Sequence, residues 1–300
     1  MSEEVNHTPN DWLNIEWRGV DSVQSKHAGL GADLQDTINR RVYHSAGVDR
    51  LYANLTLNRA EAVALLKYQA TFAGQDVLDI GVGTGRTTIY LAPLARRYEA
   101  IDYSPVMVAR ARENFPQISV RLGDMRDLSD FDDASFDFVF GSNCVLDAVS
   151  HSDRVKALCE MRRVLRPGGT LIFSSHNRQL SADLRAPRMQ WSRNPVNSAV
   201  NFVRYLRQVS NRASLAAACH EEEEFALFSD EGHDHACLHY YIDHAHQRRQ
   251  LMGLGLQTVD VLDHQGHHLH EGDAAPGSGW LIYAAVAQGA SLALTQTSVP

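Results

Sequence analysis

The sequence has few cysteines, only four in 300 residues, and none of them forms a C-x-x-C pair. We therefore expect reduced and mostly buried thiols, and we assign them no disulfide or metal-binding role. The sequence also lacks an apolar run of bilayer-spanning length, and its acidic start lacks the basic-then-apolar order of a secretory signal. These absences predict a cytoplasmic protein without a membrane partner.

Basic blocks are missing as well. The formal net charge is −8, which argues against a nucleic-acid partner because such binding requires that many phosphates be neutralised. What is present is a hydrophobic fraction of 44%, enough to bury a core in one large domain or in one domain plus an elaboration. This composition favours small-molecule chemistry. It leaves the oligomeric state open, a homodimer included.

Strand and helix patterns alternate through the middle of the chain. Strands are predicted over 76–81, 98–102, 118–124, 136–143 and 170–176, with helices over 86–97, 105–115 and 153–163 between them. Ser104 and Pro105 suit the N-cap and the first position of a helix. Five strands joined by helices predict a parallel doubly wound sheet, whose ligands lie beyond the carboxyl ends of the strands.

A glycine-rich loop follows the first of these strands, in "VLDIGVGTGR" at residues 77–86. Gly81, Gly83 and Gly85 lack a Cβ, so the chain can turn sharply and a ligand can lie against main-chain N–H groups. The spacing is G-x-G-x-G, whereas a nicotinamide or flavin fingerprint requires a glycine where Arg86 stands. The loop therefore predicts a nucleotide-like ligand and counts against a nicotinamide cofactor.

Acidic residues close the next two strands. Asp102 comes 17 residues after Gly85, where a carboxylate can accept both hydroxyls of a ribose; capping of a helix entry is the structural alternative. Asp124 can accept an adenine amino group, while Met107 and Met125 can line the flat face of the base. Core packing explains both methionines equally well.

Taken together, these motifs resemble the class I S-adenosylmethionine-dependent methyltransferases. The resemblance rests on the glycine loop after "VLD", Asp102, "GDM" after the third strand and "RVLRPGG" before the fifth, and it covers residues 72–177 closely and reaches 287 more loosely. It implies an α/β fold with a seven-stranded, doubly wound, mostly parallel sheet whose last strand is antiparallel. Residues 241–263 would supply a helix and the sixth strand, and residues 278–287 the seventh.

The same resemblance divides the chain into five segments. Residues 1–60 would form an N-terminal helical lid, and residues 61–177 the Rossmann-like cofactor-binding core. Residues 178–242 would be a cap for substrate, inserted after the fifth strand. Residues 243–288 would complete the core with a helix and the last two strands, and residues 289–300 would form a tail.

The implied cofactor is S-adenosyl-L-methionine, with S-adenosyl-L-homocysteine as the product. By the resemblance, Asp79 and Gly81 would bind the methionyl end, Asp79 as the counter-charge of its ammonium group. Asp102 would bind the ribose, and Asp124 with Met125 the adenine. The full set of cofactor-binding residues that it implies is Asp79, Gly81, Gly83, Gly85, Asp102, Tyr103, Met107, Asp124, Met125 and Asn143.

Two histidines lie at the same edge of the sheet. His176 ends the fifth strand in "SSHN", and His151 follows the fourth strand in "NCVLDAVSH". Either imidazole can remove a proton from a hydroxyl acceptor near neutral pH, so both are predicted to be catalytic. Asp147 and Asn177 share this edge and are predicted to orient the substrate. The structural alternatives are that the two histidines are hydrogen-bonded at helix entries and that the polar residues cap loops.

The alternation stops between Arg178 and Tyr241. A helix is predicted over 197–218, with its arginines facing solvent or an anion, followed by a solvated acidic run at 221–224. An insertion after the fifth strand overhangs the acceptor pocket, so this segment is predicted to set substrate choice.

Histidines concentrate near the C-terminus, where ten of the 15 lie between His220 and His270. "HDHACLH" and "HQGHHLH" have ligand-like spacings, but no cysteine or carboxylate stands at a diagnostic distance from them. A sulfonium donor also brings its own electrophile. We therefore expect no metal ligands and methyl transfer that needs no metal.

The sequence thus predicts an S-adenosylmethionine-dependent methyltransferase that acts on an O or N atom of a small polar metabolite. One alternative is a non-catalytic partner subunit that binds the cofactor, and another is an NAD-dependent oxidoreductase. The His, Arg, Asp and Tyr content of the insertion favours a built acceptor pocket over an inert partner.

Overall fold

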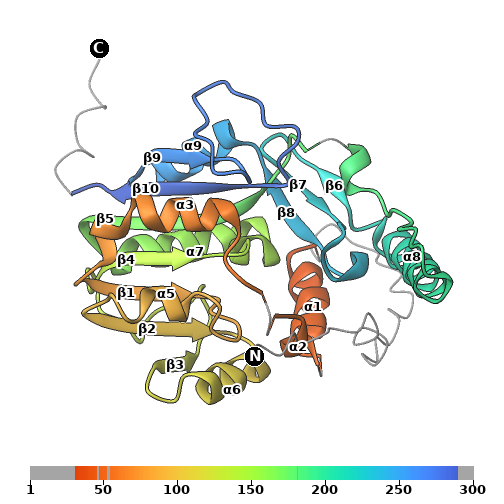
Figure 1. Ribbon diagram of the computed structural model, residues 1–300. Coiled ribbons are helices and arrows are strands. Elements are labelled where there is room, and N and C mark those ends of the chain that lie inside the picture. Colours follow the sequence, from red (N-terminus) through yellow and green to blue (C-terminus); the bar gives the residue numbers. More distant parts are fainter. Residues whose placement is uncertain (1–30, 46, 53–54, 181, 290–300) are drawn as a thin grey trace, which may run out of the picture.

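The computed structural model describes residues 31–45, 47–52, 55–180 and 182–289. Its central feature is a mostly parallel mixed sheet (Figure 1). Five strands lie parallel in the order β3-β2-β1-β4-β5. Their bounds are β1 Asp76–Ile80, β2 Arg97–Asp102, β3 Ser119–Leu122, β4 Phe136–Gly141 and β5 Leu165–Asn177. On the other side of β5 lie β10 (Trp280–Ala287), antiparallel to it, and then β9 (Leu256–Leu262). The predicted α/β architecture with an antiparallel last strand is confirmed.

The predicted number of strands is wrong, because the described residues form a sheet of ten strands rather than seven. The other three are β6 (His220–Glu221), β7 (Phe225–Phe228) and β8 (His239–Ile242), all within the insertion. β5 runs past the end of β4, and its last two residues pair with β8 through His176↔Tyr241 and Asn177↔Ile242. These strands are only two to four residues long, and every residue of β8 is buried, so neither length nor alternation signals them in the sequence.

Alternating side chains bury both faces of the sheet. On one face, Val77, Phe138 and Ile172 pack with Ala64 and Phe72 from α3 (Arg59–Lys67) and α4 (Gln69–Phe72), and with Leu91 of α5 (Thr88–Leu91). On the other face, their chain neighbours Leu78, Val139 and Phe173 pack with α7 (His151–Val164) and α9 (His244–Gly253). This period of two, with helices on both sides, defines the doubly wound sheet.

Local sequence sets where the helices begin. Asn58 and Glu61 form a capping box at α3, Ser150 caps α7, and Asp243 caps α9. Pro105 stands at the first position of α6 (Pro105–Asn114), as predicted. Ser104 makes no side-chain cap; its hydroxyl instead donates to the Tyr43 carbonyl at 2.9 Å. Ser104 therefore connects the end of an N-terminal helix to the segment that follows β2.

That N-terminal region consists, within the described residues, of α1 (Gly31–Tyr43) and α2 (Val48–Tyr52). The amide of Asn39 donates to the carbonyls of Ala148 and Leu238, both at 2.7 Å. Helix α1 thus ties the loop after β4 to the insertion, beside the carboxyl ends of the strands (Figure 1). The rest of the predicted lid, residues 1–30, lies outside the described residues, and the division of the chain into segments stays a prediction.

The insertion contains one long helix, α8 (Pro195–Leu215), which Figure 1 shows at the right edge of the molecule. The predicted helix is confirmed, but two of its arginines have a partner inside the protein. Arg204 and Arg207 both pair with Asp234, which lies in the short 3-10 helix η3 (Gly232–His235). Two other 3-10 helices are η1 (Val145–Ala148), after β4, and η2 (Ala182–Arg185), after β5.

All four cysteines are free thiols, as predicted. They are less buried than predicted, because Cys159 is exposed and only Cys237 is fully buried. Among the described helices, none combines the length and the apolar character needed to cross a membrane.

Candidate active site

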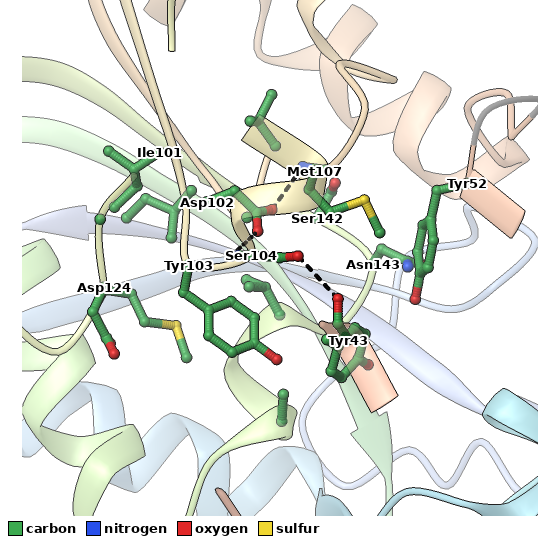
Figure 2. Close-up of a pocket in the computed structure, with 18 of the residues that line it drawn as sticks. Tyr43, Tyr52, Ile101, Asp102, Tyr103, Ser104, Met107, Asp124, Ser142 and Asn143 are labelled. Atoms are coloured by element: carbon green, nitrogen blue, oxygen red, sulfur yellow. Dashed lines mark hydrogen bonds between the residues drawn. The ribbon is translucent and has the colours of Figure 1, made fainter. Parts of the chain in front are cut away.

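A cavity lies at the carboxyl ends of β1, β2, β3 and β4, closed on one side by α1 and α2. Figure 2 shows its walls, with Asp102 and Met107 on one side and Tyr43 and Tyr52 on the other. Eight of the ten predicted cofactor-binding residues line it: Gly81, Gly83, Asp102, Tyr103, Met107, Asp124, Met125 and Asn143. Parallel strands bring these residues together because all their carboxyl ends meet at one edge.

The glycine loop makes a tight turn against the loop that follows β4. Gly81 has a φ of +68°, and a Cβ there would lie 2.4 Å from Cγ2 of Val145. Gly85, which does not line the cavity, has a φ of +97°, and a Cβ there would overlap Phe115 at 2.3 Å. At both positions the conformation and the close approach allow only glycine.

Asp102 is fixed by the same loop. Its carboxylate accepts hydrogen bonds from the backbone N–H groups of Gly83 and Ser104, both at 2.8 Å. A carboxylate has about four acceptor sites, so it keeps capacity for a ligand hydroxyl. Burial raises the pKa of Asp102 to about 6. The predicted ribose acceptor therefore faces the cavity with lone pairs to spare.

Asp79, the predicted counter-charge, lies behind the glycine loop rather than in the cavity lining. Its Oδ2 accepts hydrogen bonds from Thr87 Oγ1 at 2.5 Å and Tyr98 OH at 2.7 Å, while its buried Oδ1 has no hydrogen-bond partner. Burial raises the pKa of Asp79 to about 6. A buried carboxylate oxygen without a partner suits an ammonium group as its donor.

Asp124, the predicted adenine acceptor, is already saturated. Its Oδ1 accepts from the backbone N–H and the Nε of Arg126, and its Oδ2 accepts from Nη2 of both Arg126 and Arg40. Although burial raises the pKa of Asp124, the contacts with Arg126 and Arg40 lower it to about 2. These donors fill the four acceptor sites of the carboxylate, so the adenine role predicted for Asp124 gains no support from its side chain.

Arg86, which stands where a nicotinamide fingerprint has glycine, forms part of the cavity wall. Its two Nη atoms bind the two carboxylate oxygens of Glu61 at 2.5 and 2.7 Å, and Nη2 also donates to Ser142 Oγ at 2.9 Å. This bidentate pair joins α3, the glycine loop and the end of β4.

The predicted acceptor-side residues form a second polar group outside the cavity lining. Nδ1 of His176 donates to Asp147 at 2.7 Å, and the fully buried Asp147 also pairs with the fully buried Arg154. Asn177 donates to the carbonyls of Ala275 and Ser278 at 2.8 and 3.1 Å. Asp147 and Asn177 therefore have internal partners, and their predicted substrate roles stay predictions.

His151 is half-buried at the start of α7, apart from His176. Its Nδ1 lies 2.8 Å from Tyr240 OH, and its ring stacks on Phe225 with centroids 4.5 Å apart. Burial lowers the pKa of His151. The structure therefore does not bring the two predicted catalytic histidines together, and neither lines the cavity.

The two histidine-rich stretches have different surroundings. In the C-terminal one, three of the four histidines lie beside a hydrogen-bonding side chain: His264 beside Ser278, His267 beside Asp263 and His268 beside Asp260. The fourth, His270, packs edge-on against the ring of His268. Groups of three metal-ligand side chains within the described residues gather instead around His176, with Cys144 and Asp147 in one group and Asp230 and His239 in the other. Sequence reasoning missed Asp230, which carried no signal beyond its place in "SDEGHDH".

Comparison with known proteins agrees with this geometry. Residues 77–169 match a family described as "Methyltransferase domain". A probable S-adenosylmethionine-dependent methyltransferase of Mycolicibacterium smegmatis is 36% identical over 107 residues, covering 35% of this chain and 40% of that protein. A demethylmenaquinone methyltransferase of Deinococcus radiodurans is 35% identical over 158 residues, covering 51% and 59%. A malonyl-[acyl-carrier protein] O-methyltransferase of Serratia marcescens is 32% identical over 143 residues, covering 47% and 54%.

Solved structures extend the likeness of fold to most of the chain. The 1,6-didemethyltoxoflavin-N1-methyltransferase of Burkholderia thailandensis superposes with a TM-score of 0.53 over 90% of this chain and 94% of that one, at 15% identity. Identity this low shows the fold alone. The alignments with the curated relatives span about half of their length. Residues 77–169 are thus similar to a methyltransferase domain, and the fold of the chain resembles that of solved S-adenosylmethionine-dependent methyltransferases.

Proposed function

We propose that the protein transfers a methyl group from S-adenosylmethionine to an O or N atom of a small polar metabolite. The observation that carries the proposal is the cavity itself, where the glycine loop and a partly unsatisfied Asp102 meet at the carboxyl ends of the parallel strands. Relatives named as methyltransferases, one for malonyl-[acyl-carrier protein] and others for demethylmenaquinone, support the reaction type.

The residues present fit this cofactor. The orphaned Oδ1 of Asp79 suits an ammonium group, Asp102 suits a ribose diol, and the buried Met107 and Met125 offer an apolar wall for a base. Bound S-adenosylmethionine supplies an activated methyl group on a sulfonium. The chain's part is to hold the acceptor in line with that group and to exclude water, for which Tyr43 and Tyr52 of the N-terminal helices close the cavity.

The decisive test is methyl transfer from labelled S-adenosylmethionine into a fractionated metabolite extract, followed by identification of the product that gains a CH₂ unit in mass. Formation of S-adenosylhomocysteine that depends on an added fraction supports the proposal. Tight binding without turnover in any fraction would favour a non-catalytic partner subunit. Tight binding of NAD and hydride transfer would favour an oxidoreductase.

Asp102→Ala should weaken the binding of both S-adenosylmethionine and S-adenosylhomocysteine. Loss of a charge-assisted contact with the ribose costs about 1.5–3 kcal/mol, which corresponds to roughly 10- to 150-fold in dissociation constant. Titration calorimetry of the folded variant measures it, and Asp132→Ala, which removes an exposed carboxylate at the surface, is the matched control. Unchanged affinity in a folded Asp102→Ala protein would contradict the assignment of the cavity.

Cofactor affinity should rise with pH between 5 and 7. Burial raises the pKa of both Asp79 and Asp102 to about 6, above the value of about 4 in the unfolded chain, so each carboxyl loses its proton in this window. The ligand-free fold is therefore less stable at pH 7 than at pH 5 by the cost of two buried charges. The ammonium group favours the ionised Asp79, so affinity should be roughly tenfold lower at pH 5 than at pH 7.

Asp79→Asn tests the origin of this dependence. The amide keeps an oxygen acceptor for Thr87 and Tyr98 but cannot ionise. Calorimetry at several pH values should show lower affinity at pH 7 and a flatter profile, with the remaining slope due to Asp102. A profile as steep as that of the wild type would show that Asp79 does not sense the cofactor.

A further inference from the structure

Three side chains that can bind a metal converge beside the cavity, each from a different part of the fold. His176 lies near the end of β5, Asp230 follows β7, and His239 begins β8. Nδ1 of His239 lies 2.9 Å from Oδ2 of Asp230, and Nε2 of His176 lies 3.6 Å from the same oxygen. All three ligand atoms lie within 4.8 Å of one another. Asp230 and His239 are buried, and His176 is largely so.

Nδ1 of His239 and Oδ2 of Asp230 form a hydrogen bond at 2.9 Å, and this separation is also close to that of two ligand atoms on one ion. At 3.6 Å, the contact between His176 and Asp230 is too long for a hydrogen bond. Metal bonds of about 2.1 Å place neighbouring ligand atoms about 3.0–3.4 Å apart in octahedral or tetrahedral geometry. The two separations from Oδ2 of Asp230, 2.9 and 3.6 Å, bracket this range.

The groups behind the ligands already have the arrangement that metal sites use. Nδ1 of His176 donates to Oδ2 of Asp147, which fixes the ring with its Nε2 on the side of Asp230. Asp147 is itself held by Arg154 and by Ser175 Oγ at 2.8 Å. A carboxylate behind a histidine in this way raises the basicity of the ligand and fixes its orientation.

Asp230 is oriented just as firmly. Tyr241 OH donates to its Oδ2 at 2.7 Å, and the backbone N–H of Gly232 donates to its Oδ1 at 2.8 Å. Gly232 also permits the close packing, because a Cβ there would lie 2.8 Å from Oδ1 of Asp230 and 3.0 Å from Cε1 of His239. The ion pairs of Asp230, among the described residues, are with the two histidines alone, so no Lys or Arg neutralises this buried carboxylate.

The segment between Asp230 and His239 stores backbone strain. His233, Asp234 and His235 all have positive φ, at 50°, 54° and 63°. Left-handed conformations cost non-glycine residues of the order of 1–3 kcal/mol each and persist where surrounding contacts demand them. In this turn, the ion pairs of Asp234 with Arg204 and Arg207 of α8 stabilise the left-handed conformation. The strained turn brings Asp230 and His239 to the same point.

We propose that Nε2 of His176, Oδ2 of Asp230 and Nδ1 of His239 bind one divalent first-row transition-metal ion. Two imidazoles and one carboxylate suit ions such as Zn²⁺, Fe²⁺ or Co²⁺ and leave coordination positions open. The site adjoins the wall of the cavity: Tyr52, which lines it, contacts Nε2 of His233 at 2.9 Å, and Asn143 precedes Cys144, which groups with His176.

The metal site is inferred from the positions of the three side chains and does not depend on the proposed function. Only the binding of a methyl acceptor to the ion rests on that function. If an acceptor oxygen took one of the open positions, the ion would lower the pKa of that hydroxyl, and the proton would leave to water rather than to a protein base. The inference thereby replaces the general-base role that the sequence predicts for His176, whose Nε2 lone pair the ion would occupy. It also departs from the expectation that no metal is bound.

Metal binding can be measured without methyl transfer. The purified full-length protein is stripped with a chelator, loaded with Zn²⁺ or Co²⁺, desalted and subjected to elemental analysis, and the visible absorption of the Co²⁺ form is recorded. The expected result is one tightly held ion per chain and the ligand-field bands of a Co²⁺ ion bound by nitrogen and oxygen. Failure to retain a stoichiometric ion would overturn the proposal.

Variants then assign the ligands. Asp230→Asn keeps an acceptor for Tyr241, and His239→Ala removes an imidazole. Asp147→Asn changes the carboxylate behind His176 and is expected to lower the affinity for Zn²⁺ by roughly 10- to 100-fold. Each of the two ligand variants should lower this affinity by more than that. His267→Ala, an exposed histidine of the other histidine-rich stretch, is the matched control and should bind like the wild type. Thermal unfolding confirms that the variants are folded. Wild-type affinity in folded Asp230→Asn and His239→Ala, or loss of the ion in His267→Ala alone, would place the metal elsewhere.

Discussion

Gly81→Ala is expected to abolish measurable binding of S-adenosylhomocysteine and to lower the free energy of unfolding by about 2–5 kcal/mol. Two costs add. An alanine at a φ of +68° adopts a left-handed conformation, which costs about 1–2 kcal/mol. Its Cβ would also lie 2.4 Å from Cγ2 of Val145, and such overpacking costs about 1–3 kcal/mol as the loops move apart. Denaturant unfolding and calorimetry measure the two effects.

Gly83→Ala is the matched control for this prediction. Gly83 has a φ of +58°, but a Cβ there would meet no atom within 4 Å, so its substitution should cost only the backbone part, about 1–2 kcal/mol. Adding Val145→Ala to Gly81→Ala should recover the steric part and leave the backbone part, as a double-mutant cycle can show. If Gly81→Ala proves no more destabilising than Gly83→Ala, the close contact with Val145 is wrong.

The glycine loop and Asp102 could be predicted from the sequence because their signals are local. Each depends on a few consecutive residues after a strand, and a parallel sheet brings such positions to one edge whatever else the chain does. The saturation of Asp124 could not be predicted in this way. It depends on Arg40, which reaches Asp124 from α1, far along the chain. A motif specifies where a side chain stands, but not which partners use its acceptor sites.

The partners of the histidines could not be predicted from local sequence either. The spacing of "HQGHHLH" is ligand-like, yet three of its four histidines each have a hydrogen-bonding side chain of their own. The group that does converge takes His176 from the core and Asp230 and His239 from the insertion. Only the pairing of β8 with the extended end of β5 brings them together, and strands this short leave no periodic signal.

Arg154→Met should destabilise the fold by about 3–5 kcal/mol. The guanidinium of Arg154 and the carboxylate of Asp147 form an ion pair in which both side chains are 0% exposed. Arg154 also donates to Ser175 Oγ at 3.0 Å and to Gln247 Oε1 at 2.7 Å, and it lies 4.7 Å from the ring centre of Tyr240. Methionine fills much of the space but leaves the buried Asp147 carboxylate without the guanidinium that pairs with it.

Neutralising Asp147 should therefore rescue the protein. Asp147→Asn in the Arg154→Met background removes the uncompensated charge and keeps an oxygen acceptor for the backbone N–H of His176, so much of the lost stability should return. Asp133→Ala breaks a surface pair with Arg163 in which Asp133 is 79% exposed, and as the control it should cost at most about 1 kcal/mol. Denaturant unfolding of the four proteins measures each step. If Arg154→Met lowers the free energy of unfolding as little as Asp133→Ala does, water or a counter-ion must reach Asp147. The Asp147 carboxylate would then not be held as the structure shows.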